Sequence, residues 1–322
     1  TLVASEHEAY IFGNLPIHDN NFLGIETNEV YEPINIFINY EHSIKQIAHN
    51  NNDIYLLLDN GDLYVCGKNE YGALGLSHQN PVYDWVKNDL IENVDRIFLG
   101  TYGIFSITQD GSIYYSGKRL NENVTWMRFA VFTDRPNVKQ IISNEYNTYY
   151  LLDNGNLYVR GSANGNNGIL NLNEMTNGFN TITQIDNKRI KFLSTVTGLQ
   201  NIFFVLEDDS IYEYGWNDSL ISIGAYSLPL TGEYLYPRRL NFNKKIQQVT
   251  TGKDLTCIVA DNIIYGYGNN TYDALGHSII AINQNLFENT FFQDKEKIDS
   301  IFISQTDMYS IVLLQNGDVY GC

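Results

Sequence analysis

The sequence is poor in the residues on which several common kinds of site depend. Its 322 residues include only 3 Cys, 3 Trp, 3 Met and 6 Pro. An odd number of Cys without a Cys-x-x-Cys motif excludes a disulfide framework as the basis of the fold, and reduced, buried thiols are expected instead. No run of about 18 apolar residues is present, so we expect no membrane-spanning segment.

Basic residues are also scarce. Lys and Arg number 20 against 37 Asp and Glu, which gives a formal net charge of −17. Binding to nucleic acid depends on cations that neutralise phosphates. The densest basic group is Arg238-Arg239 with Lys244-Lys245, which is a small group in an acidic chain. Direct nucleic-acid binding is therefore not expected, and the expected partner is another protein, with basic surfaces favoured by charge.

The sequence contains no recognisable catalytic constellation. None of its six His residues lies in a metal-binding or nucleophile motif: His7, His18, His42, His49, His78 and His277. Glu207-Asp208-Asp209 resembles an acid/base pair but occupies a predicted hairpin turn, and the Gly-rich stretch 164–168 lacks the Lys-Ser/Thr of a phosphate loop. We therefore expect no catalytic residue, no metal and no cofactor.

What the chain does contain is a repeat. A hydrophobic run, a tight turn and a Tyr-bearing strand recur seven times, and six copies close on a glycine, 44 to 54 residues apart. The copies end near Gly13, Gly67, Gly117, Gly161, Gly215, Gly268 and Cys322. A period of about 50 residues built from strands is typical of a β-propeller.

Each copy predicts a β-hairpin. Turns such as Asp59-Asn60-Gly61 and Asp153-Asn154-Gly155 are expected to place Asn and Gly at positive φ. The flanking runs, such as 55–58 and 63–65, predict two largely buried strands. Before each hairpin, stretches such as 44–47 alternate apolar and polar residues, which predicts a strand with one wet face. With a further strand from the variable stretch, each copy forms one four-stranded blade.

Two copies continue beyond the closing glycine in a way that resembles the RCC1-like (regulator of chromosome condensation) repeat family. Gly61 to Gly75 reads GDLYVCGKNEYGALG, and 262–276 reads NIIYGYGNNTYDALG and ends at Gly276. The third copy has lost this tail, and Leu255 stands where the family often has His. The resemblance implies an all-β, seven-bladed propeller of RCC1 type with four-stranded blades. It also implies one domain over residues 1–322, with a ring that the N- and C-terminal segments close.

Function is expected in the loops that break the repeat, because irregular loops on a rigid scaffold commonly carry binding residues. The stretches 120–136, 226–239 and 283–297 are rich in aromatic residues, with Tyr83 to Trp85 as a weaker candidate. Hot spots of interfaces favour Trp, Tyr and Arg. The predicted partner-binding residues are Trp126, Arg128, Phe129, Tyr226, Tyr234, Tyr236, Arg238, Phe291 and Phe292. The open alternative is that these side chains belong to outer strands and pack inward.

The favoured function is therefore a non-enzymatic interaction or scaffold propeller, as a component of a larger assembly. Abundant Asn, Ile and Tyr are typical of an AT-rich genome, such as that of an amoebal giant virus, a protist or a bacterium, so a virus particle is among the expected assemblies. The expected location is the cytoplasm, the nucleus or such a particle, with secretion left open because the chain can extend beyond the residues given. The alternative, implied by the resemblance, is a guanine-nucleotide exchange factor for a Ran-like small GTPase, although no copy carries the long wedge insertion used for that activity.

Overall fold

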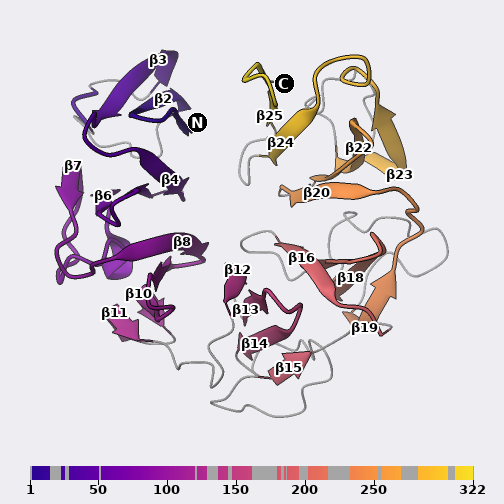
Figure 1. Ribbon diagram of the computed structural model, residues 1–322, viewed down its shortest axis with the longest axis horizontal. Coiled ribbons are helices and arrows are strands. Elements are labelled where there is room, and N and C mark those ends of the chain that lie inside the picture. Colours follow the sequence, from indigo (N-terminus) through magenta and orange to yellow (C-terminus); the bar gives the residue numbers. More distant parts are fainter. Residues whose placement is uncertain are drawn as a thin grey trace. The chain divides into compact units, whose positions relative to one another are not determined.

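The computed structural model is almost entirely β (Figure 1). It describes residues 2–14, 23–25, 29–50, 52–119, 122–128, 137–143, 147–161, 180–182, 185, 187–195, 202–216, 233–252, 255–269, 282–303 and 309–321. Within these ranges the one helical element is a short 3-10 turn, η1 (Glu70–Gly72). The chain forms two compact units, Thr1–Asn137 and Val138–Cys322.

The first unit holds three antiparallel sheets, each made from strands consecutive in sequence. The first sheet contains β1 (Leu2–Ala4), β2 (Glu8–Asn14) and β3 (Glu29–Ile38). The second contains β4 (Ile44–His49), β5 (Asp53–Leu58), β6 (Leu63–Gly67) and β7 (Val82–Lys87). The third contains β8 (Val94–Gly100), β9 (Gly103–Thr108), β10 (Ile113–Arg119) and β11 (Glu122–Arg128).

The second unit holds four sheets of the same kind among its described residues. The fourth contains β12 (Val138–Ser143), β13 (Asn147–Leu152), β14 (Leu157–Gly161) and β15 (Asn180–Ile182). The fifth contains β16 (Ile190–Thr195), β17 (Ile202–Leu206), β18 (Ile211–Trp216) and β19 (Glu233–Arg239). The sixth contains β20 (Ile246–Thr251), β21 (Leu255–Ala260), β22 (Ile263–Asn269) and β23 (Ile282–Asn289). The seventh contains β24 (Ile298–Ile303), β25 (Ser310–Leu314) and β26 (Val319–Gly321).

The hairpin turns differ from the prediction in one respect. Glycine takes the left-handed conformation, with φ of +89° at Gly61 and +81° at Gly155, but the preceding Asn does not. The Asn60 Oδ1 atom instead accepts a hydrogen bond from the backbone N–H of Asp62 at 3.0 Å. Asp and Asn side chains commonly close turns through such bonds, so Asn is selected here as an acceptor rather than for positive φ. The acidic turn of the fifth sheet works in the same way, with Asp208 as the acceptor and Asp209 at φ +63°.

The first strands of consecutive sheets are joined by a repeated glutamine contact. The Gln46 amide on β4 donates to the Ile97 carbonyl at 2.7 Å and accepts from the Ile97 N–H at 3.0 Å. Gln140 makes the same pair of bonds with Leu193, and Gln248 makes it with Ile301. These glutamines are polar residues of strands that the sequence predicts to have one solvent-exposed face. They also form hydrogen bonds between neighbouring sheets within each unit.

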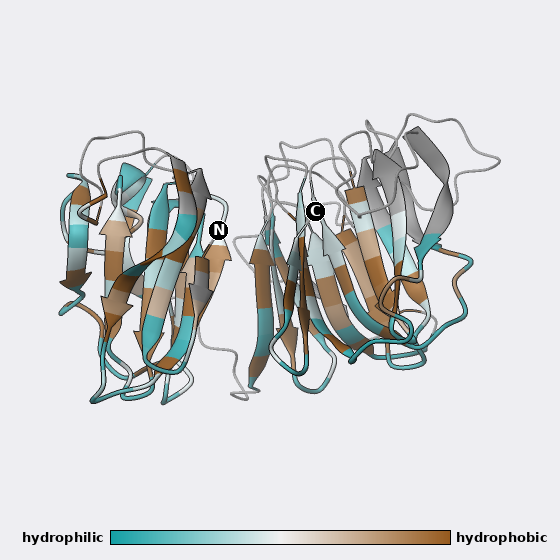
Figure 2. Cartoon of the chain, turned by 90° about the horizontal axis from the view of Figure 1, so that it is seen from above, coloured by the Kyte–Doolittle hydropathy of each residue, from teal (hydrophilic) through white to brown (hydrophobic). Residues whose placement is uncertain are grey.

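The hydrophobic core lies between neighbouring sheets. β5 is fully buried along its length, and its Tyr55 and Leu57 pack against Ile97 and Ile104 of the third sheet. Equivalent clusters join the fourth sheet to the fifth, the fifth to the sixth and the sixth to the seventh. Figure 2 shows the hydrophobic residues concentrated along the strands and hydrophilic residues at the hairpin turns. The prediction of an all-β chain with four-stranded antiparallel blades is confirmed for five of the seven described sheets.

Candidate interaction surface

The loop that follows Gly67 is organised by one buried side chain, Asn69. Asn69 is fully buried and left-handed, with φ +56°. Its Oδ1 atom accepts from the Leu74 N–H at 3.0 Å, and its Nδ2 donates to the carbonyls of His78 at 2.7 Å and Asn80 at 3.1 Å. The two ends of the loop are therefore tied to one amide, which explains why the tail requires Asn at this position.

Below this loop lies a buried carboxyl group. Asp53 is 2% exposed, and its Oδ1 atom accepts from the Asn69 N–H at 2.8 Å. Burial raises the pKa of Asp53 to about 6, although the bond from Asn69 acts in the opposite direction. Gly67 lies directly across, at φ +148°, and a Cβ atom there would come within 2.6 Å of the Asp53 Cα. Gly67 therefore occupies a site that is closed to side chains.

The loop presents an exposed aromatic residue in a strained conformation. Tyr71 is 37% exposed and left-handed, with φ +61°. Its ring lies 5.9 Å from that of Tyr102 at an edge-to-face angle of 81°. The Lys118 ammonium lies 5.0 Å from the Tyr71 ring centre and 5.3 Å from that of Tyr102. We call these three residues the Tyr71 cluster. Non-glycine residues at positive φ persist where the surrounding structure imposes this conformation, and they are frequent at functional sites.

The Tyr71 cluster joins the second and third sheets. Tyr102 lies in the turn between β8 and β9, and Lys118 lies on β10, where its N–H donates to the Tyr102 carbonyl at 3.1 Å. The Ser116 hydroxyl, also on β10, donates to the Gly72 carbonyl of the loop at 2.9 Å. The cluster is therefore fixed to the scaffold by backbone and side-chain bonds from two sheets.

Trp126, a predicted partner-binding residue, is part of the core. It is 9% exposed, and its ring packs over Gly75, where any Cβ atom would collide with it. Its Nε1–H points to the Asn88 Oδ1 at 3.4 Å. Burial at this level leaves little of the Trp126 side chain for a partner, so the inward-packing alternative describes this residue. A role for Trp126 in binding stays a prediction without structural support.

The other predicted partner-binding residues fall in three groups. Arg128 is exposed at the end of β11, and its guanidinium donates to the Ser112 hydroxyl at 3.0 Å. Phe291 is 56% exposed, while Phe292 beside it is 3% exposed and belongs to the core. Tyr234, Tyr236 and Arg238 lie on β19, with side chains outside the described part, and Phe129 and Tyr226 lie outside the described residues.

Phe291 forms a second aromatic and cationic group, in the second unit. Its ring lies 5.8 Å from that of Tyr320, and the Lys295 ammonium lies 4.5 Å from the Phe291 ring centre. We call Phe291, Tyr320 and Lys295 the Phe291 cluster. It repeats the chemistry of the Tyr71 cluster, because each combines an exposed ring, a second aromatic ring and one ammonium group.

Seven of the eight repeat glycines lie among the described residues. Gly13, Gly161, Gly215 and Gly268 lie in the strands β2, β14, β18 and β22. Gly117 has φ +131°, and a Cβ atom there would meet the backbone of the β8–β9 turn. Gly75 has φ +73° under the Trp126 ring, and Gly276 lies outside the described residues.

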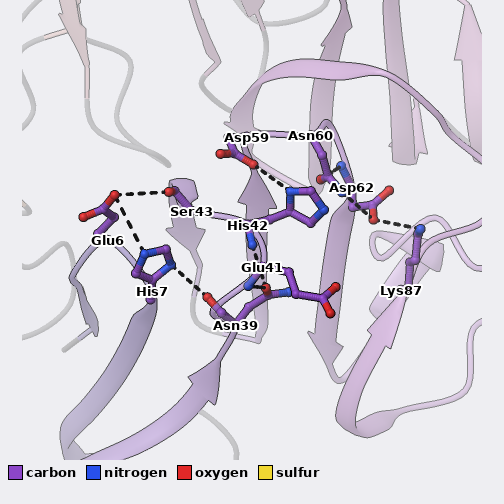
Figure 3. Close-up of polar contacts among 10 residues, drawn as sticks. All are labelled: Glu6, His7, Asn39, Glu41, His42, Ser43, Asp59, Asn60, Asp62 and Lys87. Atoms are coloured by element: carbon purple, nitrogen blue, oxygen red, sulfur yellow. Dashed lines mark hydrogen bonds and ion pairs between the residues drawn. The ribbon is translucent and has the colours of Figure 1, made fainter.

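Two of the histidines near the first two sheets, His7 and His42, lie in a polar network close to the turns that join strands (Figure 3). The His42 ring lies 3.3 Å from the Asp59 carboxylate, and the His7 ring lies 3.8 Å from that of Glu6. The Ser43 hydroxyl donates to the same Glu6 carboxylate at 3.4 Å. Glu6 thus separates the hydroxyl from the imidazole, whereas a nucleophile triad requires the imidazole to contact the hydroxyl. In this network the histidines join turns together.

The described part of the chain also places the thiols and the acidic and histidine side chains. Cys66 and Cys257 are free and buried there, as predicted, and burial raises the pKa of both thiols. No group of three or more His, Cys, Asp or Glu side chains in the described ranges is arranged to hold a metal ion. No helix among the described residues is long and apolar enough to span a membrane.

Sequence reasoning missed Tyr71, Tyr102 and Tyr320. The tail motif 67–75 assigns a role only to its glycines. The available signal is an aromatic residue directly before Gly72 in a short loop with three glycines, because loops lie at the surface and commonly carry binding residues. For Tyr102 the signal was its place in the short turn 100–103 between two predicted strands.

The described sheets define the class of protein: antiparallel blades of consecutive strands, packed face to face and recurring about every 50 residues, make it a β-propeller repeat protein. The comparisons with known proteins agree. The structure is similar to human WBSCR16, with a TM-score of 0.74, 14% identity, and coverage of 94% of this chain and 81% of that one.

It is also similar to Prp20p of Saccharomyces cerevisiae, with a TM-score of 0.70, 19% identity, and coverage of 94% and 79%. A second structure of the same yeast RCC1, bound to Kap60, gives a TM-score of 0.70 at 17% identity, with coverage of 95% and 78%. In sequence, an RCC1 repeat-containing protein of Dictyostelium discoideum is 25% identical over 215 residues, which are 60% of this chain. The chain spans 44% of the length of that relative, and no family model matches. In its fold and in its repeat pattern, the chain resembles RCC1-like repeat propellers.

Proposed function

We propose that this chain is a non-enzymatic protein-interaction module, a component of a larger assembly inside a cell or a virus particle. The single observation that carries the proposal is the Tyr71 cluster. A buried Asn69 network holds an exposed tyrosine in a strained, left-handed conformation beside a second tyrosine and a lysine. Rigid aromatic residues make favourable anchors, because little conformational entropy is lost when a partner binds.

We extend the proposal to the whole chain. Residues 1–322 form a single seven-bladed propeller, closed into a ring by the N- and C-terminal segments, with the Tyr71 and Phe291 clusters as contact sites. The seven described sheets and the similarity to solved RCC1-like structures support it. An experimental structure with six or eight blades, or with an open ring, would contradict this part.

The interaction is tested by affinity capture followed by mass spectrometry, with the wild-type chain, Tyr71→Asn and Phe291→Ala as the three baits. Truncating a buried interface aromatic typically costs about 2 kcal/mol, or roughly 30-fold in affinity. Tyr71→Asn is the informative variant, because Asn tolerates positive φ and should preserve the loop while removing the ring. Phe291→Ala tests the second cluster. We expect a partner retained by the wild type and lost from at least one variant, with unchanged thermal midpoints for both variants.

The alternative function is guanine-nucleotide exchange on a Ran-like GTPase. It is favoured by the similarity to Prp20p, whose structure was reported with its binding properties to Gsp1p and histones. This alternative predicts that catalytic amounts of the chain accelerate release of fluorescent GDP from a Ran-like GTPase. Acceleration, together with capture that neither aromatic variant weakens, would replace the interaction module with the exchange factor.

A further inference from the structure

A shallow basic pocket lies in the second unit, between the fifth sheet of the chain and the segment that leads from it to the sixth sheet. Its volume is about 340 Å³, and it is formed by the hairpin turn between β17 and β18 and by the segment that joins β19 to β20. The lining residues are Asp208, Asp209, Ser210, Arg239, Phe242, Asn243, Lys244 and Lys245. The lining therefore contains three cationic and two acidic side chains, and the charge that a ligand encounters depends on whether the acids are already paired.

Both acids are already neutralised by lysines outside the lining. Lys188 pairs with Asp208, and the Lys191 ammonium lies 2.7 Å from the Asp209 carboxylate. The Lys188 bond lowers the pKa of Asp208 to about 2, so this carboxylate stays charged and engaged across the physiological range. The acids of the turn therefore add little negative potential to the pocket.

The three cations of the lining lack a close carboxylate partner among the described residues, although Lys244 interacts with Tyr265 and more weakly with the carboxylates of Glu288 and Asp261, which raises the pKa of Lys244. Arg239, Lys244 and Lys245 are exposed, and no carboxylate among the described residues lies within 4.0 Å of their side-chain nitrogens. The Lys244 ammonium lies 5.1 Å from the centre of the Tyr265 ring. The pocket thus presents three positive groups in a chain whose net charge is −17.

The segment that carries these cations is anchored rather than loosely attached. The Leu240 N–H donates to the Ile211 carbonyl at 2.9 Å, and Phe242 is 5% exposed. The Phe242 ring packs edge-to-face on Tyr265, with centres 5.2 Å apart. Positive groups held on a fixed backbone bind an anion at lower entropic cost than the same groups on a loose loop.

We propose that this pocket binds an anionic segment of a partner protein, through carboxylate or phosphate groups held by Arg239, Lys244 and Lys245. The proposal rests on the interaction function above and specifies the chemistry of one partner. A short acidic segment fits better than a nucleic acid, because the overall negative charge repels a long polyanion, whereas a peptide meets mainly the local cations. Guanidinium and ammonium groups suit both carboxylate and phosphate.

The experiment measures fluorescence anisotropy of labelled peptides with the full chain at 50 mM and 300 mM salt. The probes are hexaglutamate, a pentapeptide with one phosphoserine and its unphosphorylated form. The test variant is Arg239→Ala/Lys244→Ala/Lys245→Ala. The control, Lys45→Ala/Lys87→Ala/Arg96→Ala, removes three cations from the first unit, where each pairs with an Asp. Thermal midpoints establish that both variants are folded.

We expect an anionic probe to bind at 50 mM salt and to weaken at 300 mM. The test variant should lose about tenfold in affinity, and the control less than twofold. Preference between hexaglutamate and the phosphopeptide identifies the source of the anion. Absence of binding by both, or equal loss in test and control, would overturn the proposal. So would a labelled DNA duplex, titrated under the same conditions, that binds more tightly than either peptide.

The outcome is independent of the aromatic clusters. Tyr71→Asn lies in the first unit and should leave peptide affinity unchanged, even where it abolishes capture of a partner. Failure of the pocket and failure of the aromatic surface are therefore separate results.

Discussion

The second and third sheets share the same hairpin but differ in the chain that leaves it. In both, the closing glycine takes positive φ against a neighbouring backbone, at Gly67 and Gly117. After Gly67 a loop built on buried Asn69 leads to β7. After Gly117, β10 continues to Arg119 and the chain returns directly as β11, whose Trp126 packs over Gly75. The third sheet thus lacks the loop that follows Gly67 in the second sheet. Its Trp126 side chain instead packs on that loop of the second sheet, over Gly75.

The comparison shows that positions within the stretch 67–75 have two different roles. Its glycines and Asn69 determine the backbone conformation of the loop, whereas the side chains at its other positions can be exposed. In the second sheet such a position is Tyr71, which is exposed; in the third the aromatic residue is Trp126, which is buried. The same residue class, aromatic, is therefore exposed in one place and part of the core in the other.

The largest effect is expected at Trp126. Trp126→Ala removes a core ring that fills the space beside Gly75, and such changes cost about 3–5 kcal/mol of unfolding free energy. Trp126→Phe retains part of the ring and should cost clearly less. Urea denaturation measures both. A loss below about 1 kcal/mol for the Ala variant would show that the side chain does not replace the missing tail.

The buried carboxyl of the second sheet has no described counterpart in the third, where Gly103 faces Gly117. Asp53 has a folded pKa of about 6 against an ordinary value of 3.8. The folded state therefore binds more protons between these values, and its stability falls as pH rises from about 4 to 6. The total change is about 3 kcal/mol, since each pKa unit corresponds to about 1.36 kcal/mol.

Asp53→Asn preserves the acceptor for Asn69 and removes the titration. The difference in unfolding free energy between wild type and this variant should change by about 2 kcal/mol between pH 4 and pH 7, in favour of the variant at pH 7. Denaturant titrations across this range measure it. A constant difference would show that the folded carboxyl titrates near its ordinary pKa.

The shared glycines should behave alike in both sheets. Gly67→Ala and Gly117→Ala each place a Cβ atom against backbone at positive φ, and we expect each to cost about 1–3 kcal/mol. Gly111→Ala is the matched control, because it also has positive φ but no atom lies within 4 Å of its added Cβ. Equal losses at all three sites would attribute the cost to φ alone, without the close approach.

Much of this scaffold was predictable from the sequence, because its signals are local. The turn at 59–61, the buried runs beside it and the glycine period specify strands and register without knowledge of distant contacts. The bonds that join sheets were not predictable. Gln46 and Ile97 are 51 residues apart, and nothing local distinguishes a bridging glutamine from a solvated one.

The candidate surface was predicted less well, for a related reason. An aromatic residue in an irregular stretch has the same local appearance whether it faces a partner, as Phe291 can, or fills a gap, as Trp126 does. Its exposure depends on the neighbouring blade, and the sequence of one repeat does not contain that information. Only residues at the tip of a constrained loop, such as Tyr71, combine a local signal with an exposed position.

The smallest effect on stability is expected at Tyr71, and it sharpens the contrast with Trp126. Tyr71→Asn removes an exposed ring from a left-handed position that Asn tolerates, so the unfolding free energy should change by less than about 0.5 kcal/mol. Tyr71→Val is the opposing control, because a β-branched residue is disfavoured at positive φ and should cost about 1–2 kcal/mol more than Asn. Urea denaturation of the three proteins separates strain in the loop from loss of the ring. If Asn costs as much as Val, the Tyr71 ring itself supports the fold, and the tail of the second sheet would then resemble the third in using its aromatic residue for stability.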